Sequence, residues 1–479
     1  MKPIRGIVWA LCALSLALSP SEATTPAGRA AAAFLEAFNT GSQAALKTFV
    51  ADRVLLKQRT ADQFAAMLMQ EFEKCGGLDA ATIKSTDAST AVLKAFAKKD
   101  RQPYAFTFQV EPAAPFRIVS LGVELGHPDD TPDSTVAEPA IRSGMTDAEI
   151  GVAFDDHVQR LTGSDSFSGA VLLAKGDKPF LRKAYGLASR RFDVPNRVDT
   201  RFNLGSINKI FTAVAIGQLA SQGKLSYDDP ISRHLPDYPK PAGDRITIRQ
   251  LVSHRSGLGD IFTDEFDRSS KTLFQRPRDF FTLFMNEPLL FDPGSSRRYS
   301  NAGYMVLGAI VEAASGMSYF DYVRKNLYAP AGMTDTDAYE ADLPVPNLAE
   351  GYTREPRGPG GQPTVRSNEF EKLFKGSPAG GGYSTLDDLL KFAGALRRHT
   401  LLDPRMTALV LAEGEQPPAG GMDGGANAGL PAVGWAGGAP GTNASLEIAG
   451  DSTVIVLANC DPPAAERLGR LALKMIRAQ

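Results

Sequence analysis

Cysteine is scarce in this sequence. Its 479 residues contain three cysteines, Cys12, Cys75 and Cys460. Cys12 lies in an apolar N-terminal run, whereas Cys75 and Cys460 fall in regions that other patterns assign to different domains. A small disulfide-stabilised fold needs denser cysteine spacing than this. Cys460 also ends the apolar run TVIVLANC, where a buried thiol is the commoner outcome. We therefore expect no disulfide between Cys75 and Cys460.

The sequence also lacks an excess of charge of either sign. Its 52 lysine and arginine residues nearly balance 54 aspartate and glutamate residues, which gives a formal net charge of -2. No basic stripe indicates a nucleic-acid partner, and no acidic tail is present. The hydrophobic content of 43% and the charged content of 22% are typical of globular proteins. A chain of this length more often forms two domains than one.

The N-terminal apolar run is too short to span a membrane. It extends from Ile7 to Leu18, whereas a spanning helix needs roughly 20 residues. A lysine and an arginine precede the run, and the small residues Ser21 and Ala23 follow it. This layout is typical of a secretory signal peptide cleaved after Ala23, with an uncleaved anchor as the alternative. We predict a signal peptide over residues 1–23, no membrane span, and export to the periplasm or the medium.

Several catalytic and cofactor-binding patterns are absent. No Gly-x-Ser-x-Gly sequence supplies the nucleophile of an α/β-hydrolase. The glycine spacing of GQLASQGKL does not match a phosphate-binding loop. The five histidines have neither zinc-like spacing nor a His-Glu-x-x-His pattern; they are His127, His157, His234, His254 and His399. We expect no metal and no organic cofactor, and we interpret His254 as structural because no acid or metal partner is identifiable.

The hydrophobic pattern divides the chain into a small and a large domain. Residues 24–125 contain two helical patterns followed by three short runs with strand-like alternation, which predicts an α+β domain. The opening of this domain resembles NTF2-like domains. Residues 126–144 are rich in proline, aspartate, serine and threonine and are predicted to form a linker. Residues 145–479 form a mixed α and β region. Its predicted hairpins turn at Gly176-Asp177 and Gly450-Asp451, and it ends in an amphipathic helix.

The stretch RFNLGSINKIFTAVAIGQLA places Ser206 and Lys209 at the start of an apolar helical run. In one interpretation Ser206 caps the helix and the Lys209 side chain extends to solvent. In the other, residues three apart share one face of the helix, so the lysine amine contacts the serine hydroxyl. A lysine among apolar neighbours has a lowered pKa and can accept the serine proton. The helix N-terminus would also stabilise the oxyanion that forms on attack.

Two further motifs follow in the chain. Tyr299-Ser300-Asn301 precedes another apolar helical run. A tyrosine near an ammonium group can become a phenolate and act as a base, and the asparagine amide can hold a substrate. Alternatively Tyr299 is a core aromatic residue and Asn301 caps the helix. The third motif, Trp435-Ala436-Gly437, leads a glycine-rich turn into a strand, where the backbone can approach a ligand closely. The alternative is an ordinary hairpin loop.

The three motifs, in this order, resemble those of the serine β-lactamase and penicillin-recognising family, particularly its class C-like branch. The resemblance covers about residues 146–479 and includes the flanking phrases ITIRQLVSHRSGL and SPAGGGYSTLDDLLKF. It implies an α+β fold in which an antiparallel sheet is flanked by helices and stands beside an all-helical lobe. It also implies that Ser206 forms an acyl-enzyme, that Lys209 and Tyr299 are catalytic, and that Asn301 binds substrate. The backbone N–H groups of Ser206 and Gly438 would form the oxyanion hole.

The third motif departs from the family pattern. Lactamases and transpeptidases usually place Lys-Thr-Gly where this chain has Trp435-Ala436-Gly437, and tryptophan cannot supply a cation for the substrate carboxylate. A similar tryptophan occurs in the family VIII carboxylesterases. The resemblance therefore implies an exported serine hydrolase acting on a small-molecule or peptide substrate, as a carboxylesterase or a D-amino-acid amidase, with Trp435, Gly437 and Gly438 among its binding residues. A true β-lactamase and a non-catalytic peptidoglycan-binding protein are the alternatives, and no oligomeric state is indicated.

Overall fold

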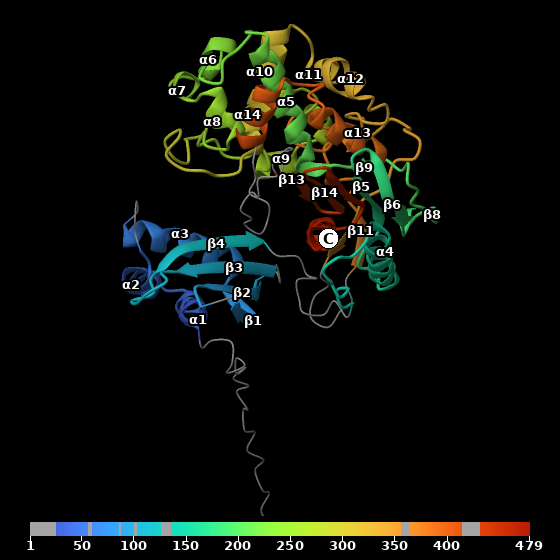
Figure 1. Ribbon diagram of the computed structural model, residues 1–479. Helices are drawn as coiled ribbons and strands as arrows, with labels where there is room; N and C mark the ends of the chain where they lie inside the picture. The colour runs from blue at the N-terminus through green and yellow to red at the C-terminus, as the bar shows by residue number, and fades with distance from the viewer. Residues whose placement is uncertain are drawn as a thin grey trace, which may run out of the picture. The chain divides into compact units, whose positions relative to one another are not determined.

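A computed structural model describes residues 25–55, 60–85, 88–99, 103–125, 136–355, 364–413 and 432–479. The chain forms two compact units, residues 1–135 and 136–479 (Figure 1). The division falls inside the predicted linker. The predicted signal peptide and the first ten residues of that linker, 126–135, lie outside the described residues. The sequence PPAGGMDGGANAG near 418–429, which is rich in glycine and typical of a loop, also lies outside them.

The N-terminal unit packs three helices against a four-stranded antiparallel sheet (Figure 1). Its elements are α1 (Pro26–Asn39), α2 (Gln43–Arg53), α3 (Ala61–Cys75), β1 (Leu78–Ser85), β2 (Thr90–Ala97), β3 (Pro103–Val110) and β4 (Ile118–Leu125). Alternate residues of β2 are buried, because one face of the strand turns toward the helices. Phe34 and Phe38 of α1 and Phe106 and Phe108 of β3 are fully buried in this core. The sequence predicted three strands and missed β1, which has few large apolar residues.

The second unit is built on a five-stranded antiparallel sheet with the order β13-β14-β15-β5-β6. Its strands are β5 (Gly169–Lys175), β6 (Lys178–Tyr185), β13 (Val433–Ala439), β14 (Thr442–Ala449) and β15 (Ser452–Ala458). Gly176 and Gly450 adopt positive φ angles of 56° and 60° between the paired strands, so both predicted hairpins are confirmed. The pairing of β15 with β5 joins the early and the late hairpin into one sheet.

Helices cover both faces of this sheet. On one face α4 (Asp147–Gly163) and α15 (Ala464–Arg477) form a core with Val171 and Leu173 of β5. On the other face Ala170 and Leu172 of the same strand pack toward the helical lobe. Because both faces of β5 are covered, its sequence is an unbroken apolar run rather than an alternating one. The fold class predicted from the sequence is confirmed for this unit.

The helical lobe surrounds α5 (Asn208–Ser221), which is buried on all sides over most of its length. A helix that is apolar all round belongs in the interior of a domain. Its longest neighbours are α10 (Asn301–Ser315), α13 (Leu386–Arg397) and α14 (Pro404–Glu413). The shorter helices are α6 (Ile231–His234), α7 (Ala242–Arg245), α8 (Ile248–Val252), α9 (Asp264–Arg268), α11 (Tyr319–Val323) and α12 (Ala329–Ala331).

Short elements connect the lobe with the sheet. They include β7 (Leu187–Ser189), β8 (Val194–Pro195), β9 (Phe202–Asn203), β10 (Tyr352–Glu355), β11 (Thr364–Ser367) and β12 (Tyr383–Ser384), with the helical turns η2 (Gly205–Ile207), η3 (Lys271–Leu273), η4 (Pro277–Leu283) and η5 (Arg324–Tyr328). No helix among the described residues is long and apolar enough to cross a membrane. The structure shows no disulfide at Cys75 or at Cys460, both of which are described.

We propose that residues 136–479 fold independently, because the two units have separate hydrophobic cores. A fragment that begins at Val136 should show a cooperative thermal transition within about 3 °C of the matching transition of the full chain, measured by circular dichroism.

A fragment that begins at Val152 serves as the control. It lacks the buried Met145 and Ile150 and the Thr146 side chain that caps α4, so its transition should lie about 5 °C lower or more. An unfolded fragment 136–479 would contradict the proposed division.

Candidate active site

Ser206 lies in η2, at the junction between β9 and α5. The side chain of Asn203 accepts a hydrogen bond from the backbone N–H of Gly205 at 2.9 Å and so closes the turn before the serine. Strand β13 lies directly against this turn: a Cβ atom at Gly437 would lie 2.0 Å from the Leu204 carbonyl oxygen and 2.7 Å from the Ser206 nitrogen. Only glycine permits so close an approach of the two backbones. The third motif is therefore brought to the nucleophile by the sheet.

Lys209 follows Ser206 by one helical turn and is buried, with 5% of its surface exposed. Its Nζ lies 3.2 Å from Ser206 Oγ and donates to Asn301 Oδ1 at 2.7 Å and to the carbonyl oxygen of Ala379. Burial lowers the pKa of Lys209 to about 7, while the Asp260 charge acts in the opposite direction. A substantial fraction of this amine is therefore unprotonated at neutral pH.

The partners of Lys209 also determine which way its lone pair points. An unprotonated amine has two N–H donors and one lone pair. The Asn301 and Ala379 oxygens can only accept, so they take both N–H groups. The remaining direction is occupied by Ser206 Oγ. The unprotonated amine thus presents its lone pair to the serine hydroxyl, which is the arrangement a general base requires.

Tyr299 contacts the same hydroxyl from the other side. Its Oη donates to Ser206 Oγ at 2.6 Å. Desolvation raises the pKa of Tyr299 above its ordinary value, and the nearby Asp260 charge acts in the same direction. The phenol therefore keeps its proton at neutral pH, and the phenolate expected from the sequence is disfavoured. Lys209, and not Tyr299, is the group whose basic form is populated.

His254 holds the Tyr299 ring. The two rings stack with their centroids 4.6 Å apart, and His254 Nδ1 accepts a hydrogen bond from the Ser300 N–H at 3.2 Å. Burial lowers the pKa of His254 to about 3, so the imidazole is neutral. The interpretation of His254 as structural did not foresee its contact with Tyr299. In the sequence, His254 is marked only by its place in the LVSHRSGL phrase, which is part of the family resemblance.

Asn301 is the first residue of α10, but it does not cap that helix. The cap is Ser300, whose Oγ accepts from the Gly303 N–H at 3.1 Å. The Asn301 amide is therefore available to Lys209, and its Nδ2 donates to Asp260 at 3.0 Å and 3.1 Å. Asp260 was not identified from the sequence, because it lies in a loop outside the three motifs.

The structure separates the residues of the third motif from the glycine that follows it. Trp435 is 8% exposed and lines a small hollow behind the nucleophile, together with Ser206, Lys209 and His254. Gly438 instead lines the main cavity, and Gly437 provides the close contact with the Ser206 turn. Of the residues expected to bind substrate, Asn301 and Gly438 therefore face the main cavity, whereas Trp435 is not among its lining residues.

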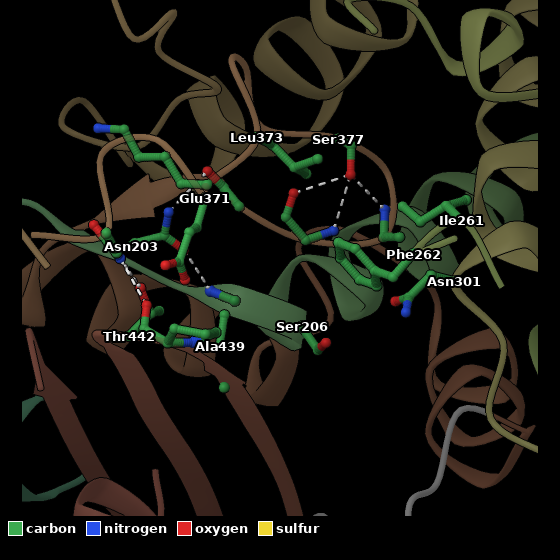
Figure 2. A pocket seen from close by; sticks show the side chains of 18 of the residues that line it. Asn203, Ser206, Ile261, Phe262, Asn301, Glu371, Leu373, Ser377, Ala439 and Thr442 are labelled. Carbon is green, nitrogen blue, oxygen red and sulfur yellow. Dashed lines mark hydrogen bonds between the residues drawn. The ribbon is translucent and has the colours of Figure 1, made fainter. Parts of the chain in front are cut away.

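The main cavity has a volume of about 710 Å³ and opens beside Ser206. Figure 2 shows Ser206 between two groups of lining residues, with Ile261, Phe262 and Asn301 on one side and Asn203, Ala439 and Thr442 on the other. The lining also includes the side chain of Phe370, which is 90% exposed, and Phe262 is 57% exposed. Such exposed aromatic side chains at a cavity favour an apolar ligand group. No group of metal-ligating side chains occurs within the described ranges.

Comparison with known proteins agrees with this geometry. Residues 154–478 match the family model described as Beta-lactamase. Penicillin-binding protein 4* of Bacillus subtilis is 36% identical over 191 residues, which are 39% of this chain and 42% of that relative. The chain thus spans about two fifths of the length of this curated relative.

Solved structures extend the comparison over a larger share of this chain. A penicillin binding protein from Bacillus halodurans is 31% identical with a TM-score of 0.57, over 66% of this chain and 97% of the other. The D-amino acid amidase from Ochrobactrum anthropi SV3 shares the fold at 24% identity and a TM-score of 0.56, over 70% of this chain and 98% of the amidase. The sequence, the fold and the surroundings of Ser206 together place this chain in the beta-lactamase family.

Proposed function

We propose that this protein is a serine hydrolase that cleaves a carboxylic ester or amide through an acyl-enzyme on Ser206. The observation that carries the proposal is the buried Lys209 amine, whose pKa is lowered to about 7 and whose Nζ lies 3.2 Å from Ser206 Oγ. A serine hydroxyl is a weak nucleophile unless a base removes its proton. A protein that merely bound a ligand would have no need of such a base.

In the proposed acylation, the unprotonated Lys209 amine takes the proton of Ser206 as Oγ attacks the substrate carbonyl carbon. The Tyr299 hydroxyl donates to Oγ and stabilises the developing alkoxide. The backbone N–H groups of Ser206 and Gly438 would receive the carbonyl oxygen as it becomes an oxyanion. When the tetrahedral intermediate collapses, the Lys209 ammonium returns its proton to the leaving alcohol or amine.

Deacylation repeats this chemistry with water as the nucleophile. Lys209, again unprotonated, takes a proton from the water as its oxygen attacks the acyl carbon, and the acid is released with Ser206 restored. We assign this step to Lys209 because the raised pKa of Tyr299 keeps the phenol protonated at neutral pH. The net reaction converts an ester or amide and one water into an acid and an alcohol or amine.

The third motif and the cavity support a carboxylesterase in preference to a β-lactamase. Trp435 places a neutral, buried side chain where many relatives have a cation. The exposed Phe262 and Phe370 side chains offer apolar surface to an acyl or alkyl group. The observation that favours the β-lactamase alternative is Lys372, a cation in the cavity lining. An amidase acting on amino-acid amides remains within the proposed reaction class.

We also propose that the chain is exported, with residues 1–23 as the signal peptide. The support is the sequence pattern of a short apolar run followed by small residues. Mass spectrometry of the mature protein from a bacterial periplasm or medium should give an N-terminus at Thr24. An intact Met1 on the exported protein would contradict a cleaved signal peptide.

Replacement of Ser206 by alanine should abolish ester hydrolysis. With p-nitrophenyl butyrate as the substrate, we expect kcat/KM to fall at least about 1,000-fold in Ser206→Ala, because the nucleophile is lost. Nitrocefin should be cleaved with a kcat/KM at least about 100-fold below that of the ester, because the third motif lacks a cation for its carboxylate.

Two outcomes would contradict the proposal in different ways. Equal ester hydrolysis by the wild type and Ser206→Ala would exclude the proposed nucleophile. Nitrocefin turnover that matches ester turnover and is lost in Lys372→Ala would instead favour the β-lactamase alternative. The matched control is Ser315→Ala, at the far end of α10 from Asn301, which should keep the wild-type rate.

A further inference from the structure

Asp260 lies behind Asn301, in the loop between α8 and α9. Its two carboxylate oxygens accept from Asn301 Nδ2 at 3.0 Å and 3.1 Å. Asn301 Oδ1, at the other end of the same amide, accepts from Lys209 Nζ at 2.7 Å. A continuous chain of hydrogen bonds therefore runs from Asp260 through Asn301 to the amine beside Ser206.

The backbone around the carboxylate fixes its orientation. Oδ1 also accepts from the N–H groups of Ile261 at 2.7 Å and Phe262 at 3.3 Å. The same loop is tied to α10 by the Ser300 hydroxyl, which donates to the Gly259 carbonyl oxygen at 2.6 Å. Oδ2 also accepts from the backbone N–H of Asn301 at 3.4 Å. Asp260 is therefore held by backbone N–H groups, and its position does not depend on the side-chain amide of Asn301.

A fixed carboxylate determines which end of an amide faces it. An ionised carboxylate only accepts hydrogen bonds, so the NH₂ end of Asn301 must turn toward Asp260. The Asn301 oxygen must then turn toward Lys209, where it takes one of the amine N–H groups. With the amide reversed, its NH₂ group would oppose the N–H groups of Lys209, and the amine would lose an acceptor.

We propose that Asp260 is a positioning residue: it fixes the direction of the Asn301 amide and thereby turns the Lys209 lone pair toward Ser206. This inference rests on the proposed function, since it assigns the alignment of the base in that reaction. It also explains why a carboxylate lies beside a site whose task is to hold an amine unprotonated. The carboxylate orients Lys209 through an intervening neutral amide.

The charges around Lys209 predict the direction in which its pKa changes when the charge of Asp260 is removed. His254, Tyr299 and Tyr304 surround the amine, and all three are neutral near pH 7, because burial lowers the pKa of the histidine and raises the pKa values of both tyrosines. The negative charge of Asp260 raises the pKa of Lys209 against the larger effect of burial. Removal of that charge should lower the pKa of Lys209 further.

The test is the pH dependence of the reaction of Ser206 with a fluorophosphonate probe, followed by intact mass. The reaction forms the Oγ–P bond and releases fluoride. It reports the nucleophilicity of Ser206 whether or not the protein turns over a substrate. For the wild type we expect the rate to rise with pH through about 7, as Lys209 loses its proton.

In Asp260→Asn, the new side chain keeps its oxygen toward the Ile261 N–H and turns its NH₂ group toward that of Asn301. The Asn301 amide must then reverse. We expect the plateau rate to fall about tenfold or more, and the acidic limb of the profile to move about one unit lower in pH. The matched control Asp264→Asn removes an exposed charge at the start of α9, the helix that follows this loop, where Asp264 pairs with Arg268. It should reproduce the wild-type profile.

The double variant Asp260→Asn/Asn301→Asp keeps the network with its polarity reversed. The asparagine NH₂ now donates to the new carboxylate, which also accepts from Lys209. We expect the acidic limb to lie at a higher pH than in the wild type, because a carboxylate in direct contact with Lys209 favours the ammonium form. We also expect the plateau rate to be higher than that of Asp260→Asn.

These outcomes separate the inference from the proposed function. An unchanged limb in Asp260→Asn, or a rate lowered equally at every pH, would overturn the positioning role even if ester hydrolysis is confirmed. If no substrate is hydrolysed but the acidic limb of the probe reaction still shifts in the variants, the hydrolase proposal would be contradicted. The positioning role of Asp260 would then still hold. A wild-type Ser206 that does not react with the probe at any pH would overturn both.

Discussion

The site depends on keeping the Lys209 amine out of water. An ammonium group in solution has a pKa near 10.5 and is useless as a base at neutral pH, whereas burial lowers the pKa of this one to about 7. The burial comes from the architecture of the second unit. Helix α5 is enclosed by the helical lobe over most of its length, and β13 closes its N-terminal end. The apolar residues that follow Lys209 therefore determine its chemistry as well as its packing.

Burial alone would leave the amine unprotonated at neutral pH without directing its lone pair. Direction comes from the acceptors on either side, the Asn301 amide and the Ala379 carbonyl, which leave only Ser206 for the lone pair. These groups belong to separate parts of the chain, and each is held by contacts of its own. Ser300 caps α10 and so frees Asn301, while the His254 ring stacks on Tyr299. The precision of the site thus arises from the packing of the lobe against the sheet.

Much of this arrangement could be predicted from the sequence, for physical reasons. Ser206 and Lys209 are three residues apart in a helix, so their proximity follows from helical geometry alone. The hairpins follow from Gly-Asp turns between apolar runs. Asp260 and the stacking of His254 could not be predicted, because both contacts join residues that are distant in the chain. The burial that raises the pKa of Tyr299 could not be predicted for the same reason, since desolvation depends on tertiary packing. Strand β1 of the N-terminal unit was also missed, because it has few large apolar residues to give an alternating pattern.

The most direct test of this account is the pKa of the Lys209 amine itself. It can be measured from the pH dependence of the Lys209 side-chain ¹⁵Nζ and ¹³Cε chemical shifts in labelled protein, with Lys209→Arg used to assign the signal. The account predicts a midpoint at about 7. A midpoint near 10.5, the ordinary value for lysine, would show that the amine is a hydrated ammonium group, and it would contradict the assignment of Lys209 as the base.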